Sequence, residues 1–369
     1  GKTTLAETML FEAGLVSRRG SIENKNTISD YHAIEHERET SVFATPLHTE
    51  WRNYKINIID TPGLDDYIGE IASTMHVTDS IVMVINAQYG VEVGTEIIWD
   101  YIDRFSHPTL FVINQIDHPS ADFDESYKSI VELVGKNVVK VQYPLVVGGA
   151  QCIIDVLKMK MYKFGPQGGK PEKLEIPKDQ IEHATELQNE LIEKAAENDE
   201  NLMELYFDKG TLNEDEMRLG IKKGMLNHEL FPVFCISALN DMGTGRLMGF
   251  IDNVAPSAAD LKPEQSLEGT AIECKPNAPT ALFIFKTVYE PNLGQISFFK
   301  VKSGEIKQND KLENSRNDEI EILNQLYIMD GKNRELVEKL SAGDIGATLK
   351  LKFTETNDTL RTKGSNITI

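Results

Sequence analysis

Short apolar runs alternate with helix-like patterns along roughly the first two thirds of the chain. A helical pattern at 93–105, for example, separates two such runs. Buried apolar strands with interleaved helices are typical of a parallel sheet that carries helices on both faces. We therefore predict an α/β domain from Gly1 to about Pro256. Its strand-like runs are 55–60, 80–86, 109–114 and 232–236.

A long insertion separates the last two of these runs. Apolar residues recur in it at three- and four-residue intervals, with glutamates on the opposite face. This spacing predicts an amphipathic helix that packs on a small subdomain, in preference to an acidic interaction tail. The apolar positions are Ile181, Ala184, Leu187, Leu191 and Ala195.

The hydrophobic period changes to two after a Pro- and Ala-containing stretch at 255–265, which marks a domain boundary. Strict alternation then places Leu282, Ile284 and Lys286 on one face of a predicted strand. Residues 294–310 read as a hairpin. Short strands with Gly, Asn and Asp turns predict a small β-barrel.

The composition is ordinary for a folded protein, with 40% hydrophobic and 26% charged residues among 369. This length allows about two or three domains. The longest apolar runs are strand-sized and the N-terminus lacks a signal pattern, so we expect a cytoplasmic protein without a membrane partner. Three widely spaced cysteines form no CxxC pair and are predicted to be reduced thiols.

The net charge of −20 argues against a generic DNA-binding module, because the chain has no diffuse basic field that could coat nucleic acid. A shaped docking surface for RNA remains compatible with this charge. Both ends of the sequence lack a flanking element, so we expect a fragment of a longer protein.

A phosphate-binding motif opens the chain. Gly1-Lys2-Thr3 matches the end of the phosphate loop G-x-x-x-x-G-K-[ST] and is followed by Thr4 and a helical pattern. Such a loop aims backbone N–H groups at phosphates, places a lysine on the β/γ oxygens and offers a hydroxyl to Mg²⁺. An ordinary helix start is the alternative if this match stands alone.

Asp60 ends a strand-like run and precedes Thr-Pro-Gly. A carboxylate at this position can hold a Mg²⁺-bound water, and the Gly63 N–H can reach a γ-phosphate. The alternative is a simple βα turn, in which Pro-Gly is common.

Two further motifs follow strand-like runs. In Asn114-Gln115-Ile116-Asp117, the carboxylate of Asp117 can accept hydrogen bonds from guanine N1–H and from the exocyclic amine, which selects guanine over adenine. Asn114 is expected to tie loops together. In Ser237-Ala238-Leu239, a backbone N–H can meet the guanine O6.

The order of the four motifs carries more weight than any one of them. Three stand at the C-terminal ends of strands, which is the edge at which ligands bind open α/β sheets, and the first stands at a helix start. Coincidence in an unrelated α/β protein is a minor alternative. We predict a site for GTP or GDP with Mg²⁺. Its residues are Gly1, Lys2, Thr3, Thr4, Asp60, Gly63, Asn114, Asp117, Ser237, Ala238 and Leu239.

With these motifs the chain resembles a translational GTPase, most closely elongation factor G, over nearly its whole length. EHERETSV (35–42) is similar to switch I of that family, DTPG to switch II, and NQID to NKxD. FFKVKSGEIKQNDKL and LSAGDIGATLKLKFTETNDTL are similar to its β-barrel second domain. The three further C-terminal domains of the family are absent from the sequence.

The resemblance implies an α/β P-loop GTPase domain with an α+β insertion, followed by a small β-barrel domain. It also implies Thr3, Ser41 and Asp60 as Mg²⁺ ligands, the ribosome (rRNA and ribosomal proteins) as partner, and a monomer. The implied boundaries are 1–150 and 231–257 for the G domain, 151–230 for a G′-like insertion and 266–369 for domain II.

The chain departs from the family at catalytic and affinity-setting positions. Leu64 stands where the family has the DTPGH histidine that orients the attacking water, so no catalytic residue is assigned there. Gln115 replaces the lysine of NKxD, which should weaken guanine binding. Glu39 replaces a glycine of switch I, whereas Ser41 keeps a hydroxyl at the Mg²⁺-binding position. The histidines weighed as substitutes for the missing one are His32, His36 and His76.

We therefore predict an elongation factor G-like translation factor that acts on the ribosome in translocation, with impaired or absent GTP hydrolysis. One alternative is an active GTPase whose water is positioned by another residue. Another is a ribosomal protection protein of the tetracycline-resistance type, although such proteins usually retain the histidine and the lysine. The last is a nucleotide-independent ribosome assembly factor.

Overall fold

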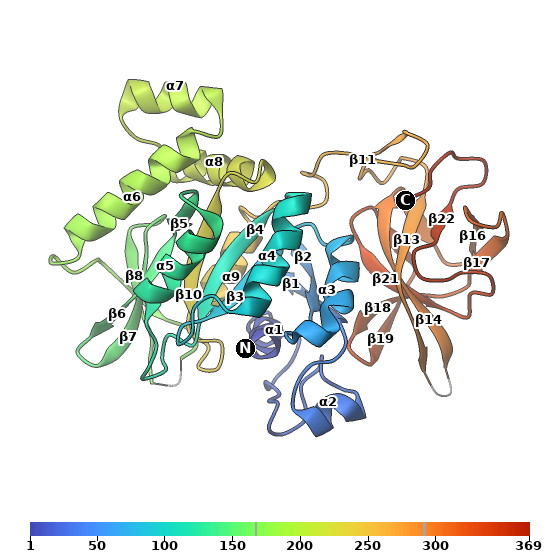
Figure 1. The fold of residues 1–369 in the computed structure, drawn as a ribbon, viewed down its shortest axis with the longest axis horizontal. Coiled ribbons are helices and arrows are strands. Elements are labelled where there is room, and N and C mark those ends of the chain that lie inside the picture. Colours follow the sequence, from blue (N-terminus) through green and yellow to red (C-terminus); the bar gives the residue numbers. More distant parts are fainter. Residues whose placement is uncertain (167, 291–292) are drawn as a thin grey trace. The chain divides into compact units, whose positions relative to one another are not determined.

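A computed structural model describes residues 1–166, 168–290 and 293–369 (Figure 1). The contacts between residues divide the chain into two compact units. Unit 1 comprises Gly1–Arg19, Trp51–Tyr54 and Ser80–Pro256. Unit 2 comprises Gly20–Glu50, Lys55–Asp79 and Ser257–Ile369.

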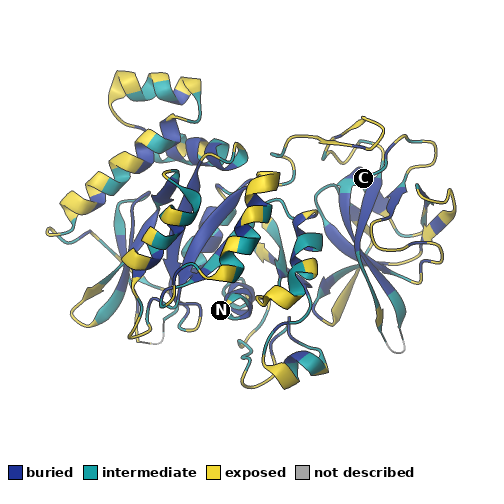
Figure 2. Ribbon diagram, viewed as in Figure 1, coloured by how far each residue is buried: buried dark blue, intermediate teal, exposed yellow. Residues whose placement is uncertain are grey.

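A four-stranded parallel sheet forms the centre of unit 1, in the order β3-β4-β10-β5. All residues of β4 and β10 are buried, and the helices beside the sheet turn their exposed residues outward (Figure 2). The structure thus confirms the predicted parallel α/β domain and its strands at 80–86, 109–114 and 232–236. The elements are β3 (Ile81–Asn86), α4 (Val93–Phe105), β4 (Thr109–Asn114), α5 (Phe123–Val134), β5 (Val138–Lys140) and β10 (Phe231–Ile236).

The strand predicted at 55–60 pairs differently from the expectation. It forms β2 (Tyr54–Asp60), whose partner in the described chain is β1 (Thr45–Trp51) rather than a parallel strand. Arg52 in the tight connection has a φ of 56°, the left-handed conformation that two-residue hairpin turns need. This local turn explains the hairpin.

Helix α1 (Lys2–Glu12) packs beside α9 (Thr244–Ile251). Its residues from Leu5 to Leu10 are all buried, so it is covered on every side, as expected of a core helix. Gly1 is the N-cap residue.

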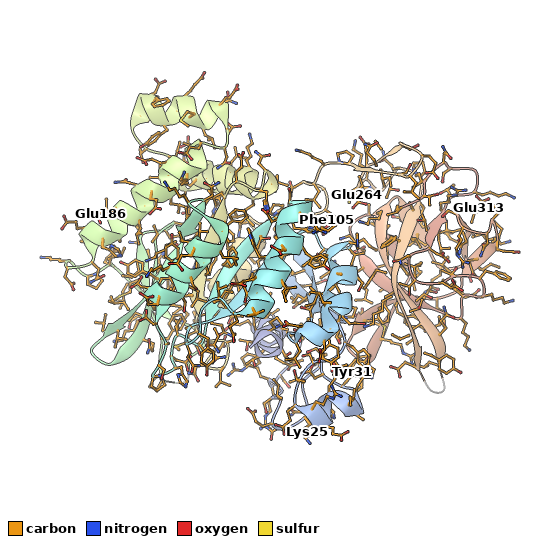
Figure 3. All side chains as sticks on the ribbon, viewed as in Figure 1. Lys25, Tyr31, Phe105, Glu186, Glu264 and Glu313 are labelled. Atoms are coloured by element: carbon orange, nitrogen blue, oxygen red, sulfur yellow. The ribbon has the colours of Figure 1, made fainter. Side chains whose placement is uncertain are left out.

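The insertion consists of an antiparallel sheet and three helices. The predicted amphipathic helix is confirmed as α6, which buries Ala184, Leu191 and Ala195 and packs on α8, while Glu186 lies on its exposed face (Figure 3). Ile181 at its first turn is exposed, unlike the prediction. The elements are β6 (Gln142–Val147), β7 (Ala150–Asp155), β8 (Lys160–Lys163), β9 (Glu172–Leu174), α6 (Ile181–Ala196), α7 (Glu200–Lys209) and α8 (Glu214–Leu226).

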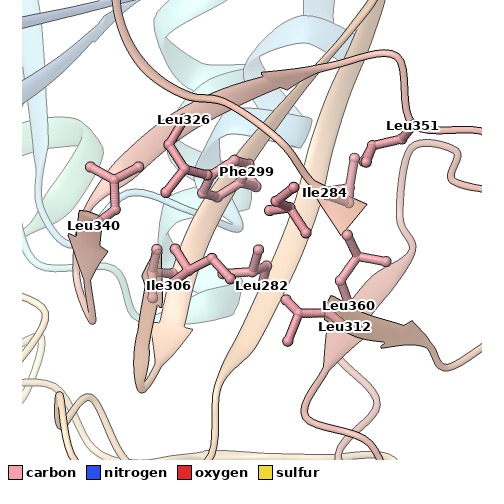
Figure 4. Close-up of a cluster of buried hydrophobic side chains, with 11 residues drawn as sticks. Leu282, Ile284, Phe299, Ile306, Leu312, Leu326, Leu340, Leu351 and Leu360 are labelled. Carbon is pink, nitrogen blue, oxygen red and sulfur yellow. The ribbon is translucent and has the colours of Figure 1, made fainter. Parts of the chain in front are cut away.

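Unit 2 contains a curled, eight-stranded antiparallel sheet, in the order β17-β16-β22-β13-β14-β21-β18-β19. It confirms the predicted second β domain. One buried cluster, which includes Leu282, Ile284 and Phe299, fills one face (Figure 4), and a second cluster with Phe283 and Phe285 fills the other. The strands are β13 (Ala281–Glu290), β14 (Gly294–Ser303), β16 (Asp310–Asn314), β17 (Ile320–Leu323), β18 (Leu326–Asp330), β19 (Asn333–Val337), β21 (Ile345–Leu349) and β22 (Thr359–Arg361).

The hairpin predicted at 294–310 is wrong. β14 pairs with β13 and β21, whereas β15 (Glu305–Lys307) pairs with β20 (Lys339–Ser341). Only Gly304 joins β14 to β15, and its N–H donates to the Lys275 carbonyl oxygen. A single residue is too short to reverse the chain into a hairpin. A further two-stranded sheet consists of β11 (Glu264–Gln265) and β12 (Ala271–Ile272).

A β-bulge also changes the predicted face of Lys286. Ile284 pairs with Phe299, but Lys286 pairs with the adjacent Phe298, so Phe285 is the extra residue of β13. Phe298 belongs to the cluster of Phe283 and Phe285. Because residues directly opposite each other share a face, Lys286 lies on that face and not on the face of Ile284.

None of the helices in the described parts of the chain has the length and apolar composition that a bilayer crossing requires.

Candidate nucleotide-binding site

The base-recognition motifs meet at one edge of the parallel sheet in unit 1. Asn86, Asn114 and Ile236, the last residues of three strands, are in register with one another. The loops that begin after β4 and β10 therefore leave the sheet side by side. These loops carry the predicted residues 114–117 and 237–239.

Asn114 links the two loops. Its buried side chain accepts hydrogen bonds through Oδ1 from the backbone N–H groups of Gln115, at 2.8 Å, and Ala238, at 3.0 Å. Burial of an amide is favourable only when it is hydrogen-bonded, and these two bonds satisfy its oxygen. The two loops are thereby fixed relative to each other.

Asp117 has a partner that the sequence analysis missed. Asn240 Nδ2 donates to Asp117 Oδ2 at 2.7 Å, and the Asn240 N–H donates to Ser237 Oγ at 3.2 Å. A carboxylate oxygen has two lone pairs, so this bond leaves acceptor capacity for a base. The only signal in the sequence is that Asn240 directly follows the tripeptide 237–239.

Gln115 has a left-handed backbone, with a φ of 67°. Its Oε1 accepts from Gln88 Nε2 at 3.0 Å. Gln88 belongs to the loop after β3, so a neutral pair of amides joins two loops of the candidate base site. This pair contains no positive charge.

The loop 237–239 has one backbone N–H left for a base. The Ser237 N–H donates to the Met242 carbonyl oxygen and the Ala238 N–H donates to Asn114, whereas no acceptor for the Leu239 N–H occurs among the described residues. The Leu239 side chain is exposed. Of the three residues predicted from the sequence, Leu239 is therefore the one whose N–H can meet a base oxygen.

The phosphate-side residues begin helix α1. Gly1 is its N-cap, Lys2 is its first residue, and Thr3 is buried. The Thr4 carbonyl oxygen accepts from the Thr8 hydroxyl at 2.9 Å. A helix N-terminus presents backbone N–H groups and partial positive charge, which suit a phosphate.

Asp60 and Ser41 belong to unit 2, where Asp30 is their shared neighbour. Asp60 ends β2, is buried, and accepts from the Ser29 hydroxyl at 2.7 Å. Ser41 is hydrogen-bonded to the Asp30 side chain. Burial raises the pKa of Asp30 to about 6, and the nearby carboxylates of Asp60 and Glu35 add to the rise, against the effect of the Ser41 hydroxyl. Asp30 belongs to none of the four sequence motifs and was not predicted as a site residue.

The oxygen donors around Asp60 fit a hard divalent cation. Hydroxyl and carboxylate oxygens are the donors that Mg²⁺ prefers. One oxygen of the buried Asp30 carboxylate, Oδ2, has no hydrogen-bond partner among the described residues. No group of three or more His, Cys, Asp or Glu side chains in the described chain is arranged to hold a metal by itself. This fits Mg²⁺, which usually takes few protein ligands and completes its shell with water and phosphate.

Leu64 lies at the start of a short 3₁₀ helix, η1 (Asp65–Tyr67), which leads into α3 (Ile68–Met75). Its side chain is 49% exposed, and Gly63 before it is also exposed. The Leu64 carbonyl oxygen accepts from the Tyr67 N–H at 3.0 Å. The side chain supplies only hydrocarbon, so it can neither accept nor donate a proton.

The histidines considered as substitutes have contacts of their own. His32 packs between the rings of Tyr31 and Phe43, with centroid distances of 4.1 and 4.7 Å. His36 Nε2 lies 2.8 Å from the Asp30 carbonyl oxygen. The His76 ring lies 6.5 Å from that of Phe283.

Helix α2 (Ala33–Arg38) ends at Glu39, whose φ of 54° and ψ of 34° are left-handed. Glycine is the usual residue at such a helix end, since it has no Cβ to clash. Glu35 of the same helix is buried and accepts through Oε1 from the backbone N–H groups of Val42, at 3.0 Å, and Phe43, at 3.1 Å. A carboxylate thus shapes the segment that follows α2.

Comparisons with known proteins agree with this arrangement. Residues 1–257 match the family described as elongation factor Tu GTP binding domain, and residues 279–363 match elongation factor G domain 2. A crystal structure of a protein from Thermus thermophilus superposes with a TM-score of 0.88 at 24% sequence identity, a likeness that shows the fold. The match covers 99% of this chain and 53% of that one, so the chain spans about half the length of its structural relative.

Proposed function

Because the chain belongs to the elongation factor G-like translational GTPases, with the GTP-binding domain and the second domain of that family, we propose that it is a translation factor that acts on the ribosome in translocation with impaired or absent GTP hydrolysis. Guanine-nucleotide binding follows from the family. The proposed base contacts are Asp117 and the Leu239 N–H, and the proposed phosphate contacts are Gly1, Lys2, Thr3, Thr4 and Gly63.

The single observation behind the loss of hydrolysis is Leu64. The side chain after Asp-Thr-Pro-Gly contains no proton acceptor or donor, and His32 and His36, two of the histidines weighed as substitutes, make ring and backbone contacts of their own. Loss of a group that positions the attacking water raises the barrier by about 4–7 kcal/mol, or several orders of magnitude in rate. Binding does not need this group, so nucleotide affinity and turnover are expected to separate.

Thr3, Ser41 and Asp60 are the residues that would hold Mg²⁺. When bound, the ion neutralises phosphate charge. Asp60 accepts a hydrogen bond from the Ser29 hydroxyl, and Ser41 is hydrogen-bonded to the Asp30 side chain. These bonds restrict the rotation of both side chains and so fix the positions of their oxygen atoms. The proposed partners are guanine nucleotide and the ribosome, which the factor meets in the cytoplasm as a monomer.

The test is multiple-turnover phosphate release by the full-length protein, with and without ribosomes, beside calorimetric titration of GDP and GTP. The proposal expects heat of binding and little or no ribosome-stimulated release. Release at the rate of an ordinary elongation factor would identify an active GTPase whose water is positioned by another residue. Titrations without heat would favour a nucleotide-independent assembly factor.

A further inference from the structure

We propose that Arg19 is a positioning residue that sets the direction of the Leu239 N–H toward the guanine O6. The inference rests on the proposed nucleotide binding and assigns a role within that site. Arg19 follows helix α1 in unit 1 and is far in sequence from the loop 237–239 that it contacts.

The Arg19 guanidinium is held against that loop by several contacts. Its Nη1 donates to the carbonyl oxygens of Ala238, at 3.1 Å, and Leu239, at 3.0 Å, and lies 3.3 Å from the Thr8 hydroxyl. The Thr8 hydroxyl oxygen lies 2.9 Å from the Ala238 carbonyl oxygen and also 2.9 Å from the Thr4 carbonyl oxygen, so these two acceptors share its single proton. The guanidinium also lies 5.7 Å from the centre of the Phe11 ring. Hydrogen bonds from a charged donor are stronger than those between neutral groups, so these bonds fix the loop firmly.

The geometry of the peptide group explains how bonds to the Ala238 carbonyl set the direction of the Leu239 N–H. In a planar trans peptide the C=O and the N–H point to opposite sides, and the described chain contains no cis peptide. The Ala238 carbonyl and the Leu239 N–H belong to one peptide group. Because Arg19 and Thr8 hold that carbonyl on one side, the Leu239 N–H faces the other. The next peptide obeys the same rule: the Leu239 carbonyl faces Arg19 and the Asn240 N–H reaches Ser237 Oγ.

The neighbouring bonds leave this N–H as the donor for O6. Ala238 donates its own N–H to Asn114, and Asn240 donates its side-chain amide to Asp117. The loop is therefore anchored by Arg19, from the segment that follows α1, and by Asn114, at the end of β4. Without Arg19, the carbonyl of the peptide between Ala238 and Leu239 loses its charged donor and keeps the neutral bonds from the Thr8 hydroxyl and from the Asp241 N–H at 3.3 Å, so the direction of this peptide is less firmly fixed.

The test compares Arg19→Met with Arg18→Met, which removes the same charge from the exposed neighbouring residue. Dissociation constants are measured on the full-length protein for GDP, 6-thioguanosine diphosphate and IDP. The thio analogue keeps N1–H and the 2-amino group but replaces O6 with a weaker acceptor, whereas IDP lacks the 2-amino group and reports on Asp117.

We expect Arg19→Met to weaken GDP binding by about tenfold, which corresponds to one hydrogen bond of about 1.4 kcal/mol. The preference for GDP over the thio analogue should fall by a similar factor. The preference for GDP over IDP should stay, since Asp117 is untouched. Arg18→Met should leave all three constants unchanged.

A thio preference that stays at the wild-type value in a folded Arg19→Met protein would overturn the role of Arg19 and leave the proposed function intact. A wild-type protein that fails to bind GDP would overturn both. Hydrogen exchange without nucleotide at Ala238 and Asn240, whose N–H groups are hydrogen-bonded within the site, tests the contact of Arg19 with the loop by itself, because exchange should speed up in Arg19→Met and not in Arg18→Met. If Arg19→Met does not fold, Arg19→Lys serves instead, and we expect a partial loss of the thio preference.

Discussion

At the scale of single residues, Leu64 is the simplest site at which to restore chemistry. Its side chain is 49% exposed, so a polar ring at this position keeps contact with solvent. We predict that Leu64→His gains ribosome-stimulated GTP hydrolysis by about two orders of magnitude or more, measured as phosphate release.

Leu64→Ala is the matched control, because it removes the same hydrocarbon without adding a proton acceptor. It should gain nothing. If Leu64→His also gains nothing, the limitation lies in Gln115 or in the 35–42 segment, and the proposed role of position 64 alone is wrong.

Glu39 carries a conformation that suits glycine. A left-handed residue with a Cβ costs about 1 kcal/mol, part of which glycine loses again through its greater freedom in the unfolded chain. Glu39→Gly should therefore raise the free energy of unfolding by about 0.5 kcal/mol in urea titrations. Arg38→Gly, one residue earlier and still helical, should lower it by about 1 kcal/mol. A loss of stability in Glu39→Gly would contradict this account.

Glu12 makes stability depend on pH near neutrality. Burial, followed by the hydrogen bond and the charge of Asp241, raises the pKa of Glu12 to about 7, against the opposing charge of Arg19. A raised carboxyl pKa stabilises the folded state fully below the unfolded pKa of 4.5, and this contribution is lost as the pH rises to about 7. We expect the unfolding free energy of the wild type, relative to Glu12→Gln, to fall between pH 5 and pH 8. A flat difference across this range in urea titrations would refute the shift.

Sequence reasoning at this scale located motif residues and missed their partners. Asn114, Asp117 and Ser237 were predictable because each lies at or just after the C-terminal end of a strand-like run. Asn240 and Arg19 were not predictable, because their hydrogen bonds join segments that are remote in the sequence. The spacing of residues along the chain does not indicate such contacts.

At the scale of elements, the bulge in β13 places Lys286 on the face of the sheet where it contacts Glu70 and Ala44. Lys286 Nζ donates to Glu70 Oε2 at 2.8 Å and to the Ala44 carbonyl oxygen at 2.9 Å, and Glu70 Oε2 accepts from the Ala44 N–H at 2.7 Å. One lysine thus closes a ring that joins β13, α3 and the segment before β1. A regular strand would have turned this ammonium toward the opposite hydrophobic cluster.

We predict that Lys286→Met lowers the free energy of unfolding by about 2 kcal/mol, because Glu70 loses its charged partner in a largely buried setting. Amide hydrogen exchange should accelerate in α3 and around Ala44.

Lys307→Met is the control, since Lys307 makes an exposed ion pair with Glu305 and should contribute less than about 1 kcal/mol. Equal losses for the two variants, or unchanged exchange around Ala44, would show that the ring does not hold these elements.

The limits of sequence reasoning about elements have a similar cause. Apolar runs predicted the strands, because a strand that is buried on both faces is a continuous run of apolar residues in the sequence. The alternation in β13 looked regular, and the bulge became visible only from its pairing with β14. The partner of β15 was likewise hidden, because β20 lies far along the chain.

At the scale of the whole molecule, charge limits how the protein can meet its proposed partner. The chain has 58 acidic and 38 basic side chains. Lys286, Lys300 and Lys302 form ion pairs inside unit 2 and add nothing to a basic surface. Ribosome binding of the proposed kind therefore has to depend on shape and local contacts rather than on a general attraction to RNA.

The domain boundaries implied by the resemblance stay predictions.

The carboxylate of Glu35 has one more consequence. With Glu70, it accepts the consecutive backbone N–H groups of Val42, Phe43 and Ala44. The protein thus supplies the acceptors that keep this stretch folded, and an incoming ligand does not have to freeze a disordered chain. Binding to a preorganised stretch carries a small conformational entropy penalty and little of the heat-capacity change that marks coupled folding.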